Sequence, residues 1–176
     1  MKNFISTYKF DIILVVLFLS LCIWIANSFS FLLISGSSMS PTYEDGNILI
    51  LKQEKTLKEN QIVIFEPPEN WNNNNGKYIK RVIGKPGDTI KIENGILIVN
   101  GKTKINAKMR ECNISNKNIK VPEDSFFAMG DNHAVSNDSY AHFCKGEKNF
   151  FVPKEKINVL GKEFKKFGGI NKWKKN

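Results

Sequence analysis

The chain has 176 residues, of which 41% are hydrophobic and 24% charged, a composition typical of one globular domain with room for a short anchor. Its net charge of +9 would suit nucleic acid or an anionic membrane, although lysines spread over any solvated surface give the same balance. No arginine-rich or aromatic-interleaved motif indicates a nucleic-acid partner, and the three cysteines contain no Cys-x-x-Cys pair, so we expect neither nucleic acid nor zinc.

An uncharged apolar run extends from Ile12 to Ile34. As a helix rising about 1.5 Å per residue, it would be roughly 34 Å long, which is enough to cross a bilayer. We therefore predict a transmembrane anchor over residues 12–34, after a short cytoplasmic segment over residues 1–11. A cleaved secretory signal is the alternative, but apolar residues resume at Phe29 and again from Phe31 to Ile34, where a cleaved signal would turn polar.

The charges that flank the apolar run predict its orientation. Lys2 and Lys9 precede the run, and no Lys or Arg follows it until Lys52. Because positive charge is retained on the cytoplasmic side, the N-terminus is expected in the cytoplasm and the rest of the chain outside. The prediction is a single-pass protein of the bacterial cytoplasmic membrane, with Ser38 only a few residues beyond the lipid.

The part of the chain after the anchor is predicted to be mainly β. Short runs of β-branched and aromatic residues are separated by turn residues, and Asn94-Gly95 and Asn100-Gly101 are typical of tight hairpins. We predict strands over residues 47–52, 61–65, 77–84, 89–93, 95–100 and 125–130, with loops over 67–77 and 104–120. The expected fold is a compact, mostly antiparallel β domain over residues 35–164, carried by one membrane helix.

Two features toward the C-terminus leave alternatives open. Residues 165–176 mix lysines with Phe167 and Trp173, which suits either contact with lipid or a solvated terminus. Cys112 and Cys144 could form a disulfide in a domain outside the cytosol, but two free buried thiols fit the sequence equally well.

A candidate for covalent chemistry is Ser38, in the turn "SGSSMSPT", where Pro41 would stiffen the backbone. A nucleophilic serine needs a base to accept its proton. A triad of Ser38, His142 and Asp138 can be written down, although no Gly-x-Ser-x-Gly elbow is present. The other available base is a lysine, which serves only when burial lowers its pKa; Lys80 fits, since it lies in an apolar strand.

Three segments of the sequence, in order, resemble the conserved boxes of type I signal peptidases. They are "SGSSMSPT", "YIKRVIGKPGD" and "MGDNHAVSNDS". Any one box would be a weak indication, but three in the family's order behind an N-terminal anchor are specific.

The resemblance implies a Ser/Lys endopeptidase that removes signal peptides from exported preproteins at small-x-small sites, with no cofactor or metal. It implies an open, antiparallel, barrel-like β fold. Ser38 would be the nucleophile and Lys80 the general base, and the backbone N–H of Ser38 would donate to the oxyanion. The supporting residues would be Ser136, which would hydrogen-bond the lysine amine, and Asp138, which would pair with Arg81. The residues expected to line the substrate pocket are Leu32, Ile34, Met39 and Ile79.

The chain also departs from the family pattern. Gly36 stands where some members carry a hydroxyl donor to the oxyanion, and His133 and Tyr140 replace the arginines that usually follow Gly-Asp-Asn and Asp-Ser. These changes would fit a divergent maturation peptidase of a plasmid-transfer system. A self-cleaving Ser/Lys repressor-type peptidase and a non-catalytic, membrane-tethered basic β domain are the further alternatives.

Overall fold

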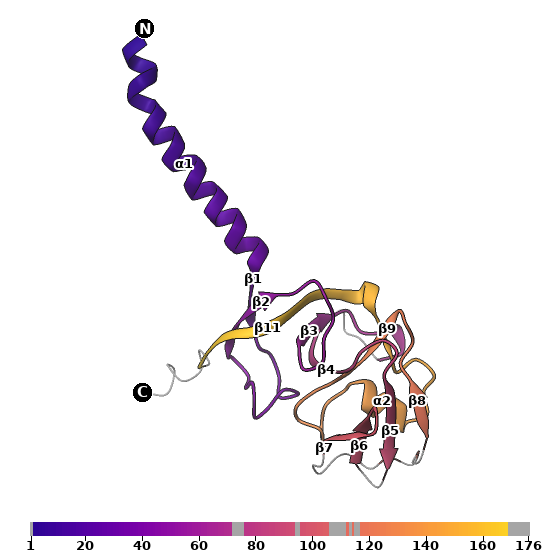
Figure 1. Cartoon of the computed structure of the whole chain (residues 1–176). Coiled ribbons are helices and arrows are strands. Elements are labelled where there is room, and N and C mark those ends of the chain that lie inside the picture. Colours follow the sequence, from indigo (N-terminus) through magenta and orange to yellow (C-terminus); the bar gives the residue numbers. More distant parts are fainter. Residues whose placement is uncertain are drawn as a thin grey trace, which may run out of the picture.

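The structure is a computed structural model that describes residues 2–71, 76–93, 96–105, 112, 114 and 117–168. Figure 1 shows one long helix, α1, projecting from a body of β-strands, with β1 at the foot of the helix. The mainly β fold class and the single N-terminal helix predicted from the sequence are confirmed.

Helix α1 spans Lys2–Ser28 and stands clear of the β body. Its segment Tyr8–Ser28 has 21 residues and a mean hydropathy of 2.4, and none of it is buried against the rest of the chain. By length and composition this segment is able to cross a bilayer.

The predicted anchor extended too far toward the C-terminus. The helix ends at Ser28, and Phe29–Leu33 form strand β1 rather than the last turns of the helix. β1 pairs with β2, with Phe29 opposite Lys52 and Leu33 opposite Ile48. The reason is that strand pairing satisfies the backbone groups of this segment, while its side chains alternate between the two faces of the sheet. An apolar run alone does not distinguish these two outcomes.

The main sheet has seven strands in the order β1-β2-β11-β3-β4-β9-β10, all paired antiparallel. The strands are β1 Phe29–Leu33, β2 Ile48–Gln53, β3 Ile62–Phe65, β4 Tyr78–Gly84, β9 Ser125–Met129, β10 Val152–Pro153 and β11 Ile157–Phe167. β11 pairs with both β2 and β3, and its register shifts once along each partner. Bulges of this kind increase strand twist, so the sheet curls into an open half-barrel.

A smaller sheet of four strands follows β4 along the chain, in the order β7-β6-β5-β8. Its strands are β5 Thr89–Glu93, β6 Ile96–Val99, β7 Lys102–Ile105 and β8 Asn118–Lys120. The predicted hairpin turn at Asn100-Gly101 is confirmed, since φ is 50° at Asn100 and 75° at Gly101, as a type I′ turn requires. The predicted turn at Asn94-Gly95 lies outside the described residues.

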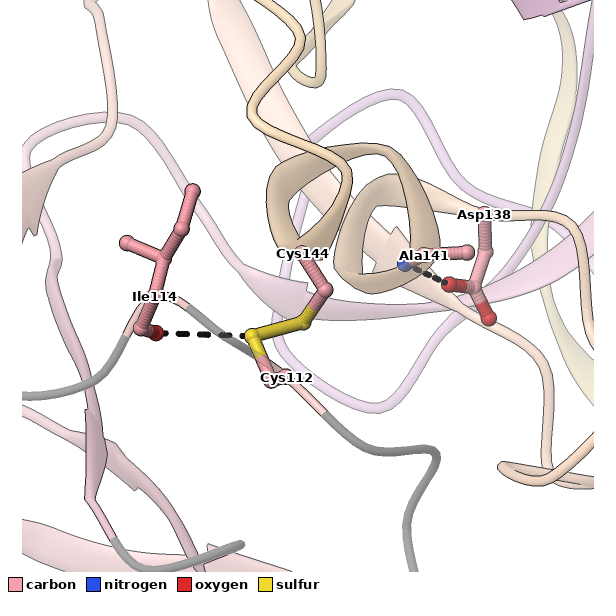
Figure 2. Close-up of a disulfide and its surroundings, with 5 residues drawn as sticks. All are labelled: Cys112, Ile114, Asp138, Ala141 and Cys144. Carbon is pink, nitrogen blue, oxygen red and sulfur yellow. Dashed lines mark hydrogen bonds between the residues drawn. A yellow bond between two sulfur atoms is a disulfide. The ribbon is translucent and has the colours of Figure 1, made fainter.

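Short helices occupy three regions without a predicted helix: η1 Glu69–Trp71 and η2 Lys154–Lys156 are single 3₁₀ turns, and α2 spans Ser139–Cys144. Asp138 caps α2 by accepting a hydrogen bond from Ala141 N at 3.0 Å. Cys144, at the other end of α2, is joined to Cys112 by a disulfide, with 4.7 Å between the Cα atoms. Figure 2 shows the disulfide and the cap on the same short helix.

The domain boundary predicted at residue 164 falls inside a strand, because β11 continues to Phe167. Trp173 and the rest of residues 169–176 lie outside the described residues. The β body therefore includes β1 at one end of the predicted range and the last residues of β11 at the other.

The core beneath the first conserved box is apolar. One cluster of buried side chains is formed by Ile34, Met39, Tyr43, Leu49, Leu51 and Ile62. Full burial of such a side chain stabilises a fold by roughly 1.5–3 kcal/mol, so this cluster fixes the turn that follows β1 against β2 and β3.

Candidate active site

Ser38 lies on a turn between β1 and β2 whose base is closed by the backbone. Ile34 N donates to Asn47 O at 2.8 Å. Met39, the next residue after Ser38, is 1% exposed and packs into the core cluster below. Pro41 follows a cis peptide bond. The position of Ser38 is therefore set by a buried neighbour and a closed turn.

Strand β4 brings Lys80 to the same place. The Lys80 Nζ lies 2.7 Å from the Ser38 Oγ, although the two residues are 42 positions apart in the chain. Lys80 is paired with Val63 of β3 and is only 4% exposed. The ring of Tyr78, two residues earlier on the same face of β4, lies 5.2 Å from Nζ. The fold thus joins the serine and the lysine that the sequence singled out.

The surroundings of Lys80 favour its neutral form. Burial lowers the pKa of Lys80 from 10.5 to about 8, because the ammonium loses its hydration. The carboxylates of Asp138 and Asp131 act in the opposite direction and raise this pKa, but burial prevails. At pH 8 the Lys80 amine is therefore neutral in about half of the molecules, and in these it is able to accept a proton.

Residues 130–138, which we call the 130–138 loop, hold Ser38 from the other side. Asn132 N donates to Ser38 O at 3.0 Å. A Cβ atom on Gly130 would lie 2.3 Å from Ser38 O and 2.3 Å from Ser136 Oγ, so only glycine fits there. Ser136 is 2% exposed and sits beside the backbone of Ser38. Its expected hydrogen bond to the Lys80 amine stays a prediction.

The predicted pairing of Asp138 with Arg81 is wrong. Arg81 instead makes a two-bond contact with Asp131, from Nε at 2.9 Å and from Nη2 at 2.7 Å. Successive residues of β4 point to opposite faces, so Arg81 is turned away from the face of Lys80. Asp138 accepts hydrogen bonds from Gly130 N at 2.9 Å and Ala141 N at 3.0 Å. Its carboxylate therefore joins the loop to α2.

A cavity of about 550 Å³ opens beside Ser38 and Lys80. It is lined by Ser35, Gly36, Ser37, Ser38, Gly76, Lys77, Tyr78, Ile79, Lys80, Val135 and Asn137. Of the four expected pocket residues, Ile79 is among them. Ile34 and Met39 are instead buried in the core cluster, and Leu32 packs against that cluster. These three residues are not among the side chains that line the cavity.

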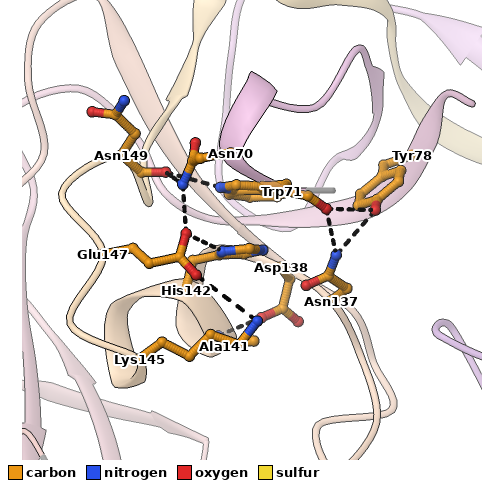
Figure 3. A network of polar contacts seen from close by, with 10 residues as sticks. All are labelled: Asn70, Trp71, Tyr78, Asn137, Asp138, Ala141, His142, Lys145, Glu147 and Asn149. Atoms are coloured by element: carbon orange, nitrogen blue, oxygen red, sulfur yellow. Dashed lines mark hydrogen bonds and ion pairs between the residues drawn. The ribbon is translucent and has the colours of Figure 1, made fainter. Parts of the chain in front are cut away.

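His142, the base of the alternative triad, is engaged elsewhere. Its ring stacks on Trp71, with 4.5 Å between the centroids and 6° between the planes, and its Nδ1 lies 2.7 Å from Glu147 Oε2. Figure 3 shows this stack beside the α2 cap. Burial lowers the pKa of His142 below 6.5, with Glu147 opposing the shift. Within the described ranges, no group of three or more His, Cys, Asp or Glu side chains could hold a metal ion.

A serine hydroxyl in hydrogen-bond contact with a buried amine is an arrangement that suits a serine hydrolase. Comparison with known families agrees with this class. Residues 5–166 match the family model described as signal peptidase, peptidase S26, and the chain belongs to this family.

Bacterial signal peptidases are among the similar proteins. The chain is 35% identical to signal peptidase I of Bacillus amyloliquefaciens over 122 residues, which cover 61% of each protein. It is 32% identical to signal peptidase I V of Bacillus subtilis (strain 168) over 147 residues, which cover 73% of this chain and 79% of the relative. The match to the first of these relatives thus spans about three fifths of its length. A crystal structure of a signal peptidase I from Enterococcus faecalis V583 superposes with a TM-score of 0.43 at 23% identity, covering 60% of this chain and 97% of that one.

Some residues around the site had no predicted role. Asp131 belongs to the third conserved box, yet only the fold shows that it binds Arg81. Asn137 also lies in the third conserved box, and its amide contacts Tyr78 and Trp71. No local sequence signal distinguishes these contacts, because each joins segments that are distant in the chain.

Proposed function

We propose that this protein is a membrane-bound serine endopeptidase that removes N-terminal signal peptides from exported preproteins, with Ser38 as nucleophile and Lys80 as general base. The observation that carries the proposal is the 2.7 Å contact between Ser38 Oγ and a Lys80 amine that burial keeps weakly basic. Membership of the signal peptidase family supports the choice of substrate.

The reaction follows from this geometry. Neutral Lys80 accepts the hydroxyl proton as Ser38 Oγ attacks the scissile carbonyl carbon, and the carbonyl oxygen becomes an oxyanion. The backbone N–H of Ser38 would stabilise that oxyanion, as backbone donors do in other acyl transfers. The Lys80 ammonium then gives its proton to the departing amine, which leaves an ester on Ser38. Lys80 next deprotonates a water molecule, whose attack on the ester releases the signal peptide and restores the serine.

The cavity indicates which side chains would bind beside the scissile bond. Ile79, Tyr78 and Val135 provide apolar walls. Gly36 and Gly76 have no side chains, so they leave space in the lining. Small residues before the cleavage site would fill such a cavity without a polar partner. A small-x-small sequence is the expected preference.

The lipid bilayer is the proposed second partner. Helix α1 leads directly into β1, where Phe31 is 65% exposed and Leu33 62%, and Phe164 of β11 is 63% exposed. The ring of Phe29 contacts that of Phe164 at 5.0 Å. These apolar side chains at the end of the helix would lie in the membrane interface on the extracytoplasmic side. Enzyme and preprotein would then share one membrane surface, which raises their effective concentration.

The test is cleavage of a preprotein with a small-x-small site by the full chain in liposomes. Ser38→Ala and Lys80→Met are expected to abolish cleavage while leaving the fold intact, as judged by circular dichroism. His142→Phe keeps an aromatic ring against Trp71 and is expected to retain cleavage within about twofold, because the imidazole plays no part in the proposed reaction. Full activity of Lys80→Met would overturn the dyad, and loss of activity in His142→Phe alone would return attention to the histidine.

A further inference from the structure

The serine and the lysine of the site come from separate segments, and their contact depends on what holds those segments together. Ser38 is held by the 130–138 loop, through Asn132 N to Ser38 O at 3.0 Å and Asn132 Nδ2 to Ser37 O at 3.1 Å. Lys80 belongs to β4. The attachments of the 130–138 loop to β4 therefore bear on the distance between Oγ and Nζ.

At its start, the loop is attached to β4 by the two hydrogen bonds between Arg81 and Asp131. Near its end, Asn137 makes a second attachment. The Asn137 Nδ2 donates to Tyr78 Oη at 3.0 Å and to Trp71 O at 3.1 Å. A carboxamide nitrogen has two N–H donors, and each of these contacts takes one. The loop is thus fastened to β4 on both sides of its contact with Ser38.

The acceptors of the Asn137 amide are fixed in place. Trp71 is fully buried, its indole N–H donates to Asn149 O at 2.9 Å, and its ring stacks on His142. The Tyr78 hydroxyl lies 3.5 Å from the same Trp71 carbonyl. Figure 3 shows the amide of Asn137 between the Trp71 carbonyl and the Tyr78 hydroxyl, with the His142 stack beside them. A donor held by two immobile acceptors constrains the backbone on either side of it.

The backbone on either side of Asn137 matters to the site. Its neighbours are Ser136, which lies against Gly130 and the Ser38 carbonyl, and Asp138, which raises the pKa of Lys80. On the other side of the contact, Tyr78 shares a face of β4 with Lys80, and its ring lies 5.2 Å from Nζ. Movement of Asn137 would therefore be transmitted to both members of the proposed dyad.

We propose that Asn137 is a positioning residue that clamps the 130–138 loop to Tyr78 and Trp71 and so sets the approach of the Ser38 hydroxyl to the Lys80 amine. This inference rests on the proposed function for its effect on catalysis. Its effect on the environment of Lys80 is independent of that function, because the Tyr78 ring whose hydroxyl Asn137 holds lies 5.2 Å from the amine, and loosening it would admit water.

The experiment compares Asn137→Ala with Tyr78→Phe in the full chain, with Asn158→Ala as the matched control. Asn158 is an exposed asparagine of β11 whose amide reaches only Glu66, at 3.4 Å. Two readouts are taken: cleavage kinetics with a soluble signal-peptide fragment, and the titration of Lys80 by NMR in protein carrying ¹³C-labelled lysine. The NMR readout requires no peptidase activity.

Asn137→Ala is expected to lower kcat about tenfold, since two hydrogen bonds that fix the geometry of the proposed dyad are lost. The Lys80 pKa is expected to rise toward its ordinary value. Tyr78→Phe removes one of the two acceptors and is expected to give a smaller change in the same direction. Adding Tyr78→Phe to Asn137→Ala should cost less than the two separate losses combined.

A Lys80 pKa and a kcat that are unchanged in Asn137→Ala would overturn the clamp, as would losses that simply add in the double variant. A loss in Asn158→Ala equal to that in Asn137→Ala would also overturn it, because the effect would then not depend on the site. If the unsubstituted chain cleaves no substrate while Asn137→Ala still raises the Lys80 pKa, the clamp stands and the proposed function fails.

Discussion

The pH dependence of cleavage is the prediction that separates the candidate bases most clearly. With a Lys80 pKa of about 8, roughly one molecule in eleven carries the neutral amine at pH 7 and roughly ten in eleven at pH 9. The expected kcat/KM therefore rises about tenfold between these two pH values and is nearly constant above pH 9. A fully solvated lysine with a pKa of 10.5 would give a rise of about a hundredfold over the same interval.

The histidine alternative gives a different curve. His142 has a pKa below 6.5, so a histidine base would already be neutral at pH 7, and the rate would rise less than about 1.5-fold by pH 9. The assay is the initial rate of cleavage of a soluble signal-peptide fragment by the full chain in detergent micelles, at constant ionic strength and subsaturating substrate. A flat profile from pH 7 upward would refute the assignment of Lys80 as the base.

The same buried amine should affect folding stability, with a sign that follows from its depressed pKa. Below pH 8 both the folded and the unfolded chain hold the proton, and the folded state bears the full cost of a buried ammonium. Between about pH 8 and 10.5 the unfolded state binds more protons, so stability rises with pH. We compare the unfolding free energy of the unsubstituted chain with that of Lys80→Met at each pH. Between pH 7 and pH 10, that of the unsubstituted chain should rise by about 2.5 kcal/mol relative to that of the variant. The measurement is denaturant titration of both proteins at the two pH values. If the difference between their unfolding free energies is the same at both, the amine is hydrated in the folded state.

Two further predictions concern the scaffold. Gly130→Ala would place a methyl group 2.3 Å from the backbone oxygen of Ser38, so the serine must move; we expect at least a hundredfold loss of kcat/KM and a destabilisation of about 1–3 kcal/mol, measured by kinetics and thermal unfolding. Replacing Cys112 and Cys144 by serine opens a loop with a sequence separation of 32 and is expected to lower the unfolding free energy by about 3–4 kcal/mol. Cys22→Ser, which alters a free cysteine in α1, is the control and should leave the thermal midpoint unchanged, and equal midpoints for all three proteins would contradict a structural disulfide.

The elements that depend on local pattern could be predicted from the sequence. Short runs of β-branched and aromatic residues bounded by turn residues predicted β4 and β9, and the Asn-Gly pair predicted the turn at Asn100, because both signals are set by neighbouring residues. The end of the N-terminal helix was misplaced because Phe29–Leu33 is as apolar as the helix before it, and only pairing with β2 shows that it is a strand. Local pattern thus gives the type of an element more securely than its boundary.

The contacts of charged side chains were harder to predict for the same reason. Spacing along β4 shows that Lys80 and Arg81 point in opposite directions, but it does not say which carboxylate each will meet. Asp131 and Asp138 both lie in the third conserved box, and either could have paired with Arg81. The choice depends on α2, whose N-terminal amides take up Asp138, and this short helix has no strong sequence signal of its own.

The placement of these two carboxylates bears directly on how a lysine could act as a base near neutral pH. Each raises the pKa of Lys80, and either one bonded to the amine would hold the proton there. Asp131 is instead bound by two nitrogens of the Arg81 guanidinium, and Asp138 by the backbone amides of Gly130 and Ala141. With these partners on the carboxylates, burial is the largest influence on the Lys80 pKa, and the amine contacts the hydroxyl that it would have to deprotonate, at 2.7 Å. The arginine and the helix cap therefore serve the proposed chemistry by drawing negative charge away from the base while still fixing the loop that holds Ser38.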